Sequence, residues 1–551
     1  MITLPHKIIL TYLQNPARAL DVVRREVLRG KKMADDISKS VLLKAYHELL
    51  AAGKIAKNPE LEKLLIKRGV RTLSGVSIIT VLTAPYPCPG RCIYCPTEEC
   101  MPKSYLSDEP AAARALALKF DPYEQVARRI EALERNGHPT DKIELIVKGG
   151  SWTAYPLAYQ YWFVGRCFAA ANSVSLRGVP TKSGQRSNPK ALLVTKGLLR
   201  HFVPRNDIKK LQKTNEKSKH RIVGLTLETR PDMISAQSIK VMRELGCTRV
   251  ELGVQSTDDK VLKLIKRGHN TQAVKDATRL LKNSGFKVDY HLMPQLPGTT
   301  PARDLKMMLE VFENPDYRPD MIKIYPCTVI KGTELYRWLK SGKYKPYSDK
   351  KLIDTIVKFK TQIPRYCRVS RLIRDIPSGH IMGGNKVTNL RQVIQAEMAR
   401  LGLRCNCLRC REVGHQACNM KLVTCNIKLF VEKYKANDGM EYFLSYEDSK
   451  RQVVYAFCRL RLLLKSYKLQ VTSYKAYIRE LHTYGQMIPI AQTGKIQHTG
   501  LGKALMLKAE EICRKNKVEK LAVISGVGVR DYYRHLGYRL EKGYMVKKLA
   551  A

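Results

Sequence analysis

The sequence of 551 residues has no apolar run close to the roughly 18 residues of a membrane-spanning helix, which excludes such a segment. Its N-terminus lacks the basic segment, apolar core and cleavage site of a signal peptide. Acidic residues are scarce: 49 Asp and Glu stand against 98 Lys and Arg, a formal charge of +49. So large an excess indicates a polyanionic partner, and nucleic acid is favoured over an anionic membrane surface. We expect a cytoplasmic protein that binds nucleic acid and no membrane.

Among fifteen cysteines, Cys88, Cys92 and Cys95 form a C-x3-C-x2-C array. Without a secretion signal, such clusters indicate metal sites more than disulfides. Three thiolates can hold three irons of a cubane cluster and leave the fourth iron open, whereas four cysteines would fill every iron. An open iron can bind S-adenosylmethionine and pass it an electron. A zinc knuckle is the alternative, but zinc usually takes four ligands in two separated pairs, and no second pair is near. The array therefore predicts a radical [4Fe-4S] cluster.

A second cysteine group, Cys405, Cys407 and Cys410, offers three soft ligands in a C-x-C-x2-C pattern. One more ligand would complete a tetrahedral zinc site. The candidates for it are His380, His415, Cys418 and Cys367. A reduced cysteine-rich linker is the alternative. We expect structural zinc here, and the sequence does not choose the fourth ligand.

Residues 71 to about 375 alternate short apolar segments with helical patterns, which is typical of a parallel sheet or a TIM-type barrel. Six strands are expected, so the barrel would be partial. The expected strands lie at 75–82, 142–147, 222–227, 249–254, 287–293 and 321–325, with helices at 232–245 and 271–284. The first cysteine array follows the first strand, at the C-terminal mouth where barrel active sites lie.

The rest of the chain divides by composition. Residues 1–70 read as a basic helical module, and 376–425 as the zinc-binding linker. Residues 173–221 are poor in apolar residues and rich in Lys and Arg, which predicts a basic insertion within the barrel domain: a solvated loop or a loop that contacts RNA. From 426 to 551 the pattern changes to adjacent strands, at 443–448, 453–464 and 476–484, followed by a glycine turn and a helix.

The glycine turn is the second chemical signal. It consists of Gln497, Gly500, Leu501, Gly502 and Lys503, ahead of an apolar stripe at helical spacing. Backbone N–H groups at such a helix start favour an anion, so a pyrophosphate would fit. A strand ends near 488–490 before the turn, another at 520–525 follows the helix, and Tyr532 and Tyr533 come next. This order is that of GCN5-related N-acetyltransferases (GNAT), which use acetyl-coenzyme A. Either tyrosine could instead be a core aromatic.

A radical cluster motif and an acetyltransferase domain in one basic chain resemble the family of the Elongator catalytic subunit, the tRNA uridine(34) acetyltransferases. The likeness runs along nearly the whole chain, and the cysteine-bearing linker looks more like archaeal or bacterial members. Besides the cysteines, it rests on segments such as Glu228-Thr229-Arg230-Pro231-Asp232, Gly253-Val254-Gln255-Ser256, Lys323-Ile324-Tyr325-Pro326 and Arg479-Glu480-Leu481-His482. The chain differs from the family at Pro96-Thr97-Glu98, where Pro-Gly-Gly is usual, and at Lys148-Gly149-Gly150-Ser151-Trp152, where Met-Gly-Gly-Thr-Phe is common.

The resemblance implies roles for individual residues. Cys88, Cys92 and Cys95 would bind the [4Fe-4S] cluster, and Gly149 and Gly150 would contact S-adenosylmethionine. Acetyl-coenzyme A would lie along Glu480, Leu481, His482 and Thr483, with its pyrophosphate at Gln497, Gly500, Leu501, Gly502 and Lys503. Tyr533, with Tyr532 beside it, would lie at the thioester. Lys142 would contact acetyl-coenzyme A from the radical domain; an ordinary solvated lysine is the alternative.

The reaction implied is carboxymethylation at C5 of wobble uridine 34 in the anticodon stem-loop of tRNA. A radical made from S-adenosylmethionine would activate the acetyl methyl group, because a nucleobase carbon is a poor nucleophile. Two other functions are consistent with parts of the sequence: a protein lysine acetyltransferase with a structural cluster, and a tRNA-binding scaffold without radical activity. The +49 charge disfavours the first, since a positive enzyme repels lysine-rich tails. Elongator-like accessory subunits or a homodimer are compatible with the resemblance.

Overall fold

The computed structural model describes residues 2–29, 37–66, 72, 74–173, 205–415, 427–464, 474–485 and 500–549. Several sequence predictions fall outside these ranges: residues 174–204 of the basic insertion, the strand near 488–490, Gln497, Cys418 and the side chain of His415. Within the described ranges, no helix combines the length and the apolar character needed to cross a bilayer.

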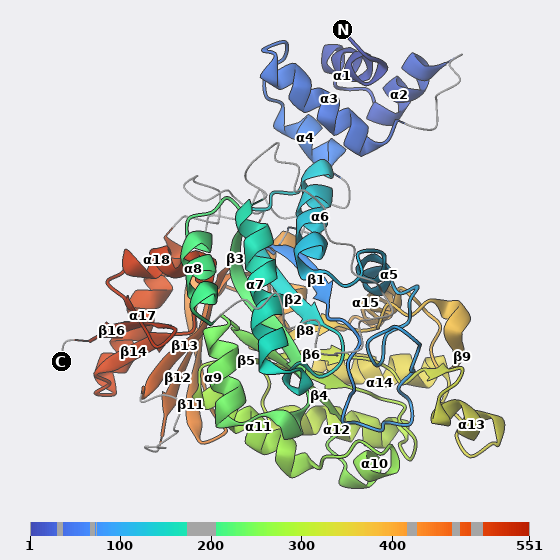
Figure 1. The fold of residues 1–551 in the computed structure, drawn as a ribbon, viewed down its shortest axis with the longest axis vertical. Coiled ribbons are helices and arrows are strands. Elements are labelled where there is room, and N and C mark those ends of the chain that lie inside the picture. Colours follow the sequence, from blue (N-terminus) through green and yellow to red (C-terminus); the bar gives the residue numbers. More distant parts are fainter. Residues whose placement is uncertain are drawn as a thin grey trace.

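The N-terminal helices form a separate small body, at the top of Figure 1. They are α1 (Leu4–Gln14), α2 (Leu20–Leu28), α3 (Lys39–Ala51) and α4 (Pro59–Leu65). Ile8, Val23, Leu42, Tyr46 and Leu61 build their own core. Contact with the rest of the chain runs from α3 to α6 (Pro122–Arg135). The helical module expected for residues 1–70 is therefore present and has an independent core.

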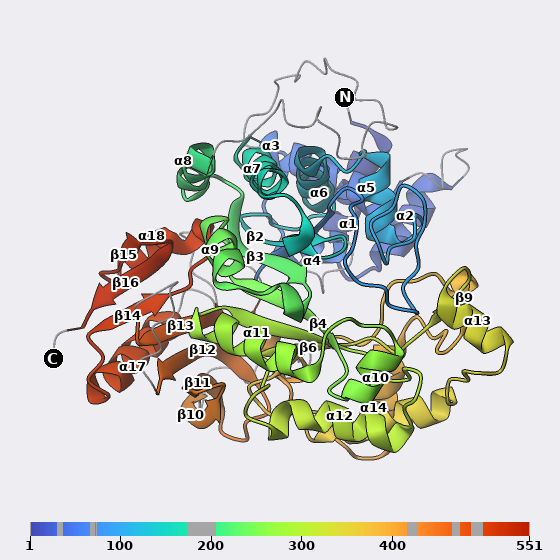
Figure 2. The ribbon, with the colours of Figure 1, turned by 60° about the horizontal axis from the view of Figure 1, so that its bottom comes forward.

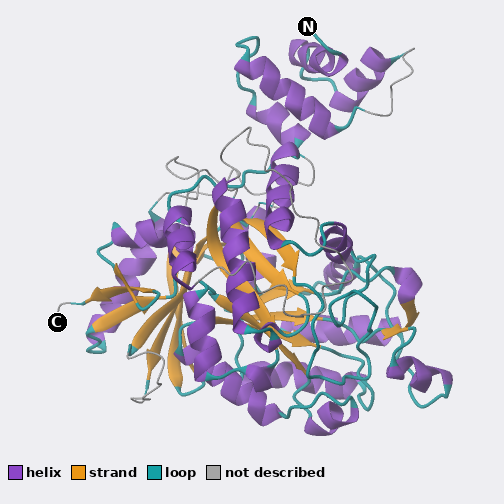
Figure 3. Ribbon diagram, viewed as in Figure 1, coloured by secondary structure: helices purple, strands orange, loops and turns teal. Residues whose placement is uncertain are grey.

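A seven-stranded parallel sheet, curved into a partial barrel, forms the centre of the molecule (Figure 3). Its order is β1-β2-β3-β4-β5-β6-β8. The strands are β1 (Ser77–Leu82), β2 (Lys142–Lys148), β3 (Arg221–Thr229), β4 (Arg249–Gln255), β5 (Lys287–Leu292), β6 (Met321–Ile324) and β8 (Arg368–Arg371). All six predicted strands are confirmed. The seventh, β8, escaped prediction because Arg-Val-Ser-Arg contains one apolar residue and gives no strand pattern.

Helices cover the outer face of this sheet (Figure 3). They include α5 (Pro110–Ala117), α6, α7 (Leu157–Ser173), α9 (Ala236–Glu244), α11 (Thr271–Asn283), α12 (Pro301–Glu313) and α14 (Asp349–Thr361). Helices α10 (Asp259–Leu264) and α13 (Glu334–Lys340) belong instead to a separate hydrophobic cluster with Ile93 of the cluster loop. Polar caps set many of their starts: Asp121, Asn270 and Thr300 each accept a backbone N–H from the first turn that follows. These caps lie just after a loop, so each strand-loop-helix unit is specified locally.

Part of the predicted basic insertion is a helix and not a loop. Residues 205–215 form helix α8 (Arg205–Asn215), which packs against α7. Ile208 is buried, and Asn215 is buried with its side-chain amide bonded to the His220 carbonyl at 3.0 Å. Lysines dominate the sequence of this segment, and the few buried positions that make it a packed helix were too sparse to reveal it.

The linker adds β9 (Ile381–Gly383), which pairs with β7 (Val329–Ile330) of the barrel region, and helices α15 (Leu390–Arg400) and α16 (Leu408–Arg411). The C-terminal region is a second seven-stranded sheet, in the order β10-β11-β12-β13-β14-β16-β15. Its elements are β10 (Ile427–Ala436), β11 (Gly439–Asp448), β12 (Val454–Leu463), β13 (Ala476–Thr483), α17 (Leu501–Lys515), β14 (Lys520–Val523), α18 (Arg530–Arg534), β15 (Arg539–Glu541) and β16 (Tyr544–Lys548). The predicted strands, glycine turn and helix of this region are confirmed where the structure describes them.

The two sheets share one hydrophobic core. Phe443, Phe457, Tyr477 and Tyr544 of the C-terminal sheet belong to the same buried cluster as the barrel strands. Both Figure 1 and Figure 2 show this sheet, in orange and red, beside α9 and α11. Arg243 of α9 donates to the Gly543 carbonyl at 2.8 Å, which agrees with that arrangement. The acetyltransferase-like sheet is thus packed onto the barrel rather than tethered to it.

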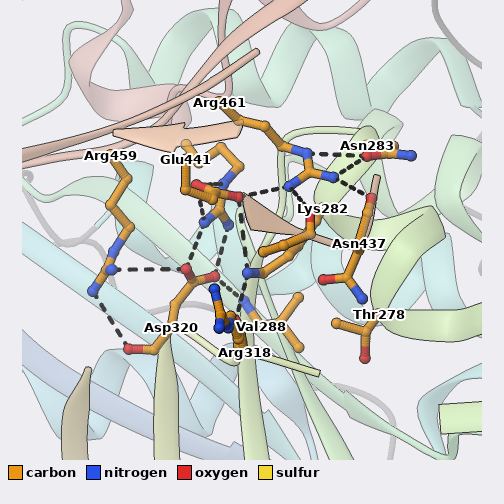
Figure 4. Close-up of polar contacts among 12 residues, drawn as sticks. Thr278, Lys282, Asn283, Val288, Arg318, Asp320, Asn437, Glu441, Arg459 and Arg461 are labelled. Atoms are coloured by element: carbon orange, nitrogen blue, oxygen red, sulfur yellow. Dashed lines mark hydrogen bonds and ion pairs between the residues drawn. The ribbon is translucent and has the colours of Figure 1, made fainter. Parts of the chain in front are cut away.

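Buried charges reinforce the junction (Figure 4). Arg479 binds Asp320 of the barrel at 2.7 Å and Glu441 of β11 at 2.9 Å, and Arg461 reaches Glu441 at 2.8 Å. A bulge in β13 places Arg479 there, because the β12–β13 register shifts between its neighbours. The buried positive charge of Arg479 is compensated, since it binds the carboxylates of both Asp320 and Glu441. A buried network of this kind fixes the orientation of the two sheets.

Candidate active site

The first cysteine array lies on the loop after β1, at the C-terminal mouth of the barrel, as predicted. Cys88, Cys92 and Cys95 are all half-buried. Arg267 donates to Cys92 Sγ at 3.4 Å, and the Gly90 N–H donates to Cys88 Sγ at 3.4 Å. Burial raises the pKa of the Cys95 thiol to about 11, and Cys92 adds to the shift. Hydrogen bonds to sulfur are a feature of iron–sulfur sites, so this donor set fits a cluster held by three cysteines.

The glycine pair at the end of β2 lies directly beside that loop. Gly149 has φ +115°, and a Cβ there would lie 2.2 Å from Thr83 Oγ1. The Tyr155 hydroxyl donates to the carbonyls of Ala84 at 2.7 Å and Gly149 at 3.0 Å, and a hydrogen bond of 2.7 Å joins it to Thr83. Tyr155 therefore ties the start of the cluster loop to the glycine turn. Nothing in the sequence singled it out, because its partners are distant in the chain.

One large cavity, of about 1250 Å³, extends from the cluster loop to the start of α17; its lining includes none of the three cysteines and neither Gly149 nor Gly150. At the cluster end Tyr94 and Pro96 line it, on either side of Cys95. At the other end it is lined by Gly500, Leu501, Gly502, Lys503, Tyr532 and Tyr533. The interior of a closed TIM barrel is filled by packed side chains, whereas this partial barrel holds an open channel. The channel is the feature that joins the chemistry of the two sheets.

Strand alternation explains the polar lining of the channel. Every second residue of β2 faces it, namely Lys142, Glu144, Ile146 and Lys148, while the residues between them are buried against the outer helices. The other strands do the same, so the channel wall is built in layers. The acetyltransferase-like sheet closes the end where the strands begin, and the cluster loop lies where they finish.

The layer nearest the cluster is a set of interlocked charges. Lys148 Nζ lies 2.7 Å from Glu228 and also binds Glu251, which Lys323 binds in turn; His291 Nε2 is 3.1 Å from Glu251. Burial raises the pKa of both glutamates, but Lys148, Lys323 and His291 together outweigh it, so the pKa of each is lowered. Burial disfavours the charged form of Lys148, but the carboxylates of Glu228 and Glu251 raise its pKa above the usual lysine value. Lys148 and both glutamates are therefore ionised at neutral pH.

The layer at the opposite end meets the C-terminal sheet. Glu480 binds Lys287 of β5 at 3.3 Å and Arg459 at 2.8 Å, and a hydrogen bond of 2.8 Å joins His482 Nε2 to the Ser74 carbonyl. Lys142 lines this end, and burial lowers its pKa to about 8 while Asp141 opposes the shift. The structure therefore brings Lys142 and the predicted segment Glu480–Thr483 to the same cavity.

Strands β13 and β14 separate next to this segment. Within the described strands, β13 pairs with β14 only from Ala476 to Ile478, while Glu480–Thr483 pair with β12. Gly500 precedes α17 with φ +92°, and a Cβ on Gly502 would lie 3.0 Å from the Tyr532 hydroxyl. Tyr532 is 39% exposed and Tyr533 only 5%. Tyr532 thus presents more surface to the cavity than Tyr533, which packs against Tyr538.

The second cysteine group is also assembled. The Sγ atoms of Cys405, Cys407 and Cys410 all lie within 4.8 Å of one another. Lys360 Nζ is 3.8 Å from Cys410 Sγ. Three converging thiols suit zinc or another soft metal.

The predicted ligand His380 does not join this group. Its Nε2 lies 2.6 Å from Asp108, at the exposed cluster side of the barrel. Cys367 is buried nearby, where its carbonyl accepts the Leu408 N–H at 2.9 Å. His380 is one of the four candidate ligands in the sequence, but β9 and α15 lie between it and the cysteines along the chain.

Comparison with known proteins agrees with this architecture. Residues 200–311 match the Radical SAM superfamily and 319–400 its C-terminal domain, which extends past the boundary expected at 375. The tRNA uridine(34) acetyltransferase of Methanocaldococcus infernus is 43% identical over 498 residues, 88% of each chain. That of Dehalococcoides mccartyi is 40% identical over 88% of this chain and all of the relative. Elongator complex protein 3 of Homo sapiens is 38% identical over 89% and 88%.

A solved structure, the archaeal Elp3 of Methanocaldococcus infernus with an N-terminal deletion, superposes with a TM-score of 0.72 at 41% identity, covering 87% of this chain and all of that one. The radical SAM match implies a [4Fe-4S] cluster and S-adenosylmethionine. With such identity over most of both lengths, this chain belongs to the family of tRNA uridine(34) acetyltransferases and Elongator complex protein 3.

Proposed function

We propose that this protein installs a carboxymethyl group at C5 of wobble uridine 34 in tRNA, using acetyl-coenzyme A and a radical derived from S-adenosylmethionine. The observation that carries the proposal is the single cavity between the cluster loop and the glycine turn. Neither a structural cluster nor a binding scaffold needs such a connection. The names of the relatives, which specify tRNA uridine(34), support the choice of substrate.

Each end of the cavity has residues suited to one group. Cys88, Cys92 and Cys95 would hold the cluster, and the Gly149-Gly150 turn would hold S-adenosylmethionine. Together, when bound, these groups supply the radical chemistry needed to remove a hydrogen atom from an acetyl methyl group. The segment 480–483, at the point where β13 and β14 part, and the start of α17 would hold acetyl-coenzyme A, whose pyrophosphate suits the helix N-terminus.

Side chains of the channel orient the reactants. The Tyr532 hydroxyl, whose pKa burial raises to about 12, stays protonated and can donate to the thioester oxygen. Lys142 would approach the acetyl group from the barrel side. The walls of the channel exclude bulk water from a reactive intermediate.

The remaining parts supply binding and support. The module of residues 1–70 and the segment 173–221 would contact tRNA phosphates through their Lys and Arg side chains. Cys405, Cys407 and Cys410 would hold a structural zinc in the linker 376–425, with a fourth ligand still to be identified. The GNAT-type domain from 426 to 551 would bind acetyl-coenzyme A.

The test is anaerobic incubation of the reconstituted protein with tRNA, S-adenosylmethionine, a reductant and acetyl-labelled acetyl-coenzyme A, followed by nucleoside analysis. We expect the label on uridine 34. Cys92→Ala should abolish labelling, while Cys100→Ala, an exposed cysteine on the same loop, should not. Absence of label with an intact cluster defeats the proposal. Labelling of protein lysines, or tRNA binding with no transfer, would favour the acetyltransferase or the scaffold.

A further inference from the structure

In the layer of charges nearest the cluster, Glu228 and Lys148 are the most exposed of the five side chains that line the cavity. The side chains of Glu228 and Lys148 are 24% and 13% exposed, whereas Glu251 is fully buried and Lys323 and His291 are each 6% exposed. Both line the cavity, and their charged atoms lie 2.7 Å apart. The cavity therefore meets a carboxylate and an ammonium group side by side.

We propose that Glu228 and Lys148 read the Watson–Crick edge of the target uracil, with Glu228 accepting the N3–H and Lys148 donating to O4. The inference rests on the proposed function and identifies the residues that select the base.

The hydrogen-bonding capacity of the pair matches uracil and not cytosine. An ionised carboxylate can only accept and an ammonium can only donate. Uracil offers an acceptor at position 4 and a donor at position 3, and cytosine offers the reverse. The reacting atom, C5, is adjacent to position 4 in the ring, so directing C5 at the acetyl group fixes which position meets which side chain. In that orientation cytosine would place a donor against Lys148 and an acceptor against Glu228.

Two tyrosines beside the pair provide surfaces for a flat base. Tyr105 and Tyr325 are half-buried and line the same cavity. The Arg374 guanidinium lies 5.2 Å from the Tyr105 ring centre, and the Tyr325 ring meets His291 edge-on at 5.3 Å. A single-stranded base is typically held by stacking on such rings while its edge is hydrogen-bonded. The layer thus offers both stacking surfaces and hydrogen-bonding groups for a base.

The buried members of the layer hold the pair in place. Glu251, whose side chain is fully buried, also binds Lys148 and is held in turn by Lys323 and His291. Glu228, Glu251 and His291 lie close enough together for a metal ion. The ammonium groups of Lys148 and Lys323 already contact these carboxylates, so a cation would meet two positive charges there. The arrangement suits a neutral polar ligand better than a metal.

The two contacts differ in how they relate to the family. Glu228 opens the segment Glu228-Thr229-Arg230-Pro231-Asp232, on which the resemblance partly rests, whereas Lys148 replaces the usual Met. We therefore expect Glu228 to carry most of the selectivity and Lys148 to add a contact particular to this chain.

The experiment pairs variants of the whole protein with altered anticodon stem-loops. Binding is compared for loops carrying uridine, N3-methyluridine or cytidine at position 34. In the wild type, N3-methylation should weaken binding roughly tenfold or more, the scale of losing a good base contact. In Glu228→Ala this penalty should fall below about threefold, because the acceptor is gone. Lys148→Met should keep the N3-methyl penalty and reduce discrimination against cytidine.

Asp375→Asn serves as the matched control, since Asp375 is an exposed carboxylate that also lines the cavity. This variant should show the same loss of affinity on N3-methylation as the wild type. S-adenosylmethionine affinity should be the same in all variants; a loss confined to Glu228→Ala would assign the pair to that ligand's adenine and overturn the inference. An unchanged N3-methyl penalty in Glu228→Ala would also overturn it. If the wild type labels uridine 34 in the reaction assay, either result leaves the proposed function standing.

Discussion

At the scale of single residues, the site depends on positions where backbone and neighbours exclude a side chain. Gly149 combines a left-handed φ of +115° with Thr83 Oγ1 only 2.2 Å from where a Cβ would be. The Tyr155 hydroxyl fixes the same turn from another direction. The family resemblance identifies the glycine pair, but the clash that a side chain at Gly149 would make comes from Thr83, more than sixty residues earlier in the chain.

We expect Gly149→Ala to weaken S-adenosylmethionine binding at least roughly tenfold, which corresponds to about 1.4 kcal/mol. The new methyl group must displace Thr83 and with it the end of β1. Gly332→Ala is the control: Gly332 has φ +84° but nothing within 4 Å of a Cβ, so only backbone strain of about 1 kcal/mol applies. Calorimetric titration with S-adenosylmethionine measures the affinity of both variants. Equal affinities in the two variants would contradict the assignment of this turn.

At the scale of elements, the separation of β13 from β14 creates the second half of the site. The strands pair over three residues and then part, and α17 starts at the opening they leave. Gly502 lies in the first turn of α17, where a side chain would point at Tyr532 and Thr483. Glycine is therefore needed at this position because a side chain would fill the space beside Tyr532 and Thr483, and not because of its backbone angle.

Gly502→Ala gives opposite effects on binding and stability. Alanine in a helix is favoured over glycine by roughly 0.5–1 kcal/mol, so the melting temperature should stay level or rise. Acetyl-coenzyme A affinity should fall about tenfold or more, because the methyl group occupies the opening. Calorimetry with acetyl-coenzyme A and thermal unfolding together check this, and S-adenosylmethionine affinity is the control. Undiminished acetyl-coenzyme A binding would place that cofactor elsewhere.

At the scale of the whole molecule, the buried network in Figure 4 holds the two sheets at one angle, and therefore holds the two ends of the channel in line. Burying this network has an energetic cost, which Lys282 shows. This lysine is fully buried, 3.8 Å from Glu441 and close to the positive charges of Arg461 and Arg479. Burial lowers its pKa to about 8, although Asp320 and Glu441 oppose the shift.

Lys282→Met should therefore be more stable than the wild type at pH 7. The folded-state pKa, about 8, lies below the usual lysine value of 10.5, so between these values the unfolded chain binds more protons. Wild-type stability should rise with pH across that window relative to the variant, and the advantage of the variant should shrink. Thermal unfolding of both proteins from pH 7 to 10 measures the difference. A gap that is constant with pH would show that Lys282 is not the cause.

The charge of +49 makes a second prediction for the whole molecule. Binding of tRNA through phosphate contacts releases counterions, so affinity should fall steeply with salt. For six or more contacts we expect a loss of about 10³-fold between 50 and 200 mM salt. Fluorescence anisotropy with labelled tRNA gives the slope, and acetyl-coenzyme A binding, with few phosphates, should change far less. A flat response would argue against nucleic acid as the reason for the excess charge.

Much of this could be predicted from the amino-acid sequence. Cys88, Cys92 and Cys95 lie within eight residues, so their spacing alone predicts the cluster loop. Short apolar segments that alternate with helical patterns predict six of the barrel strands. Helix α8 and strand β8 could not be predicted, since each has too few buried positions to form a pattern. His380 is one of four candidates for the fourth zinc ligand in the sequence, and the fold places it beside Asp108 instead.

The sequence by itself determined which chemical groups are present and on which elements they lie, because cluster spacing, strand alternation and helix caps are properties of neighbouring residues. Only the tertiary structure decided which groups meet. Lys148 reaches Glu228 and Glu251 across 80 and 103 residues of chain, and Arg479 reaches Asp320 across 159. Such encounters depend on the register of the parallel strands and on the docking of the two sheets, which no local pattern encodes.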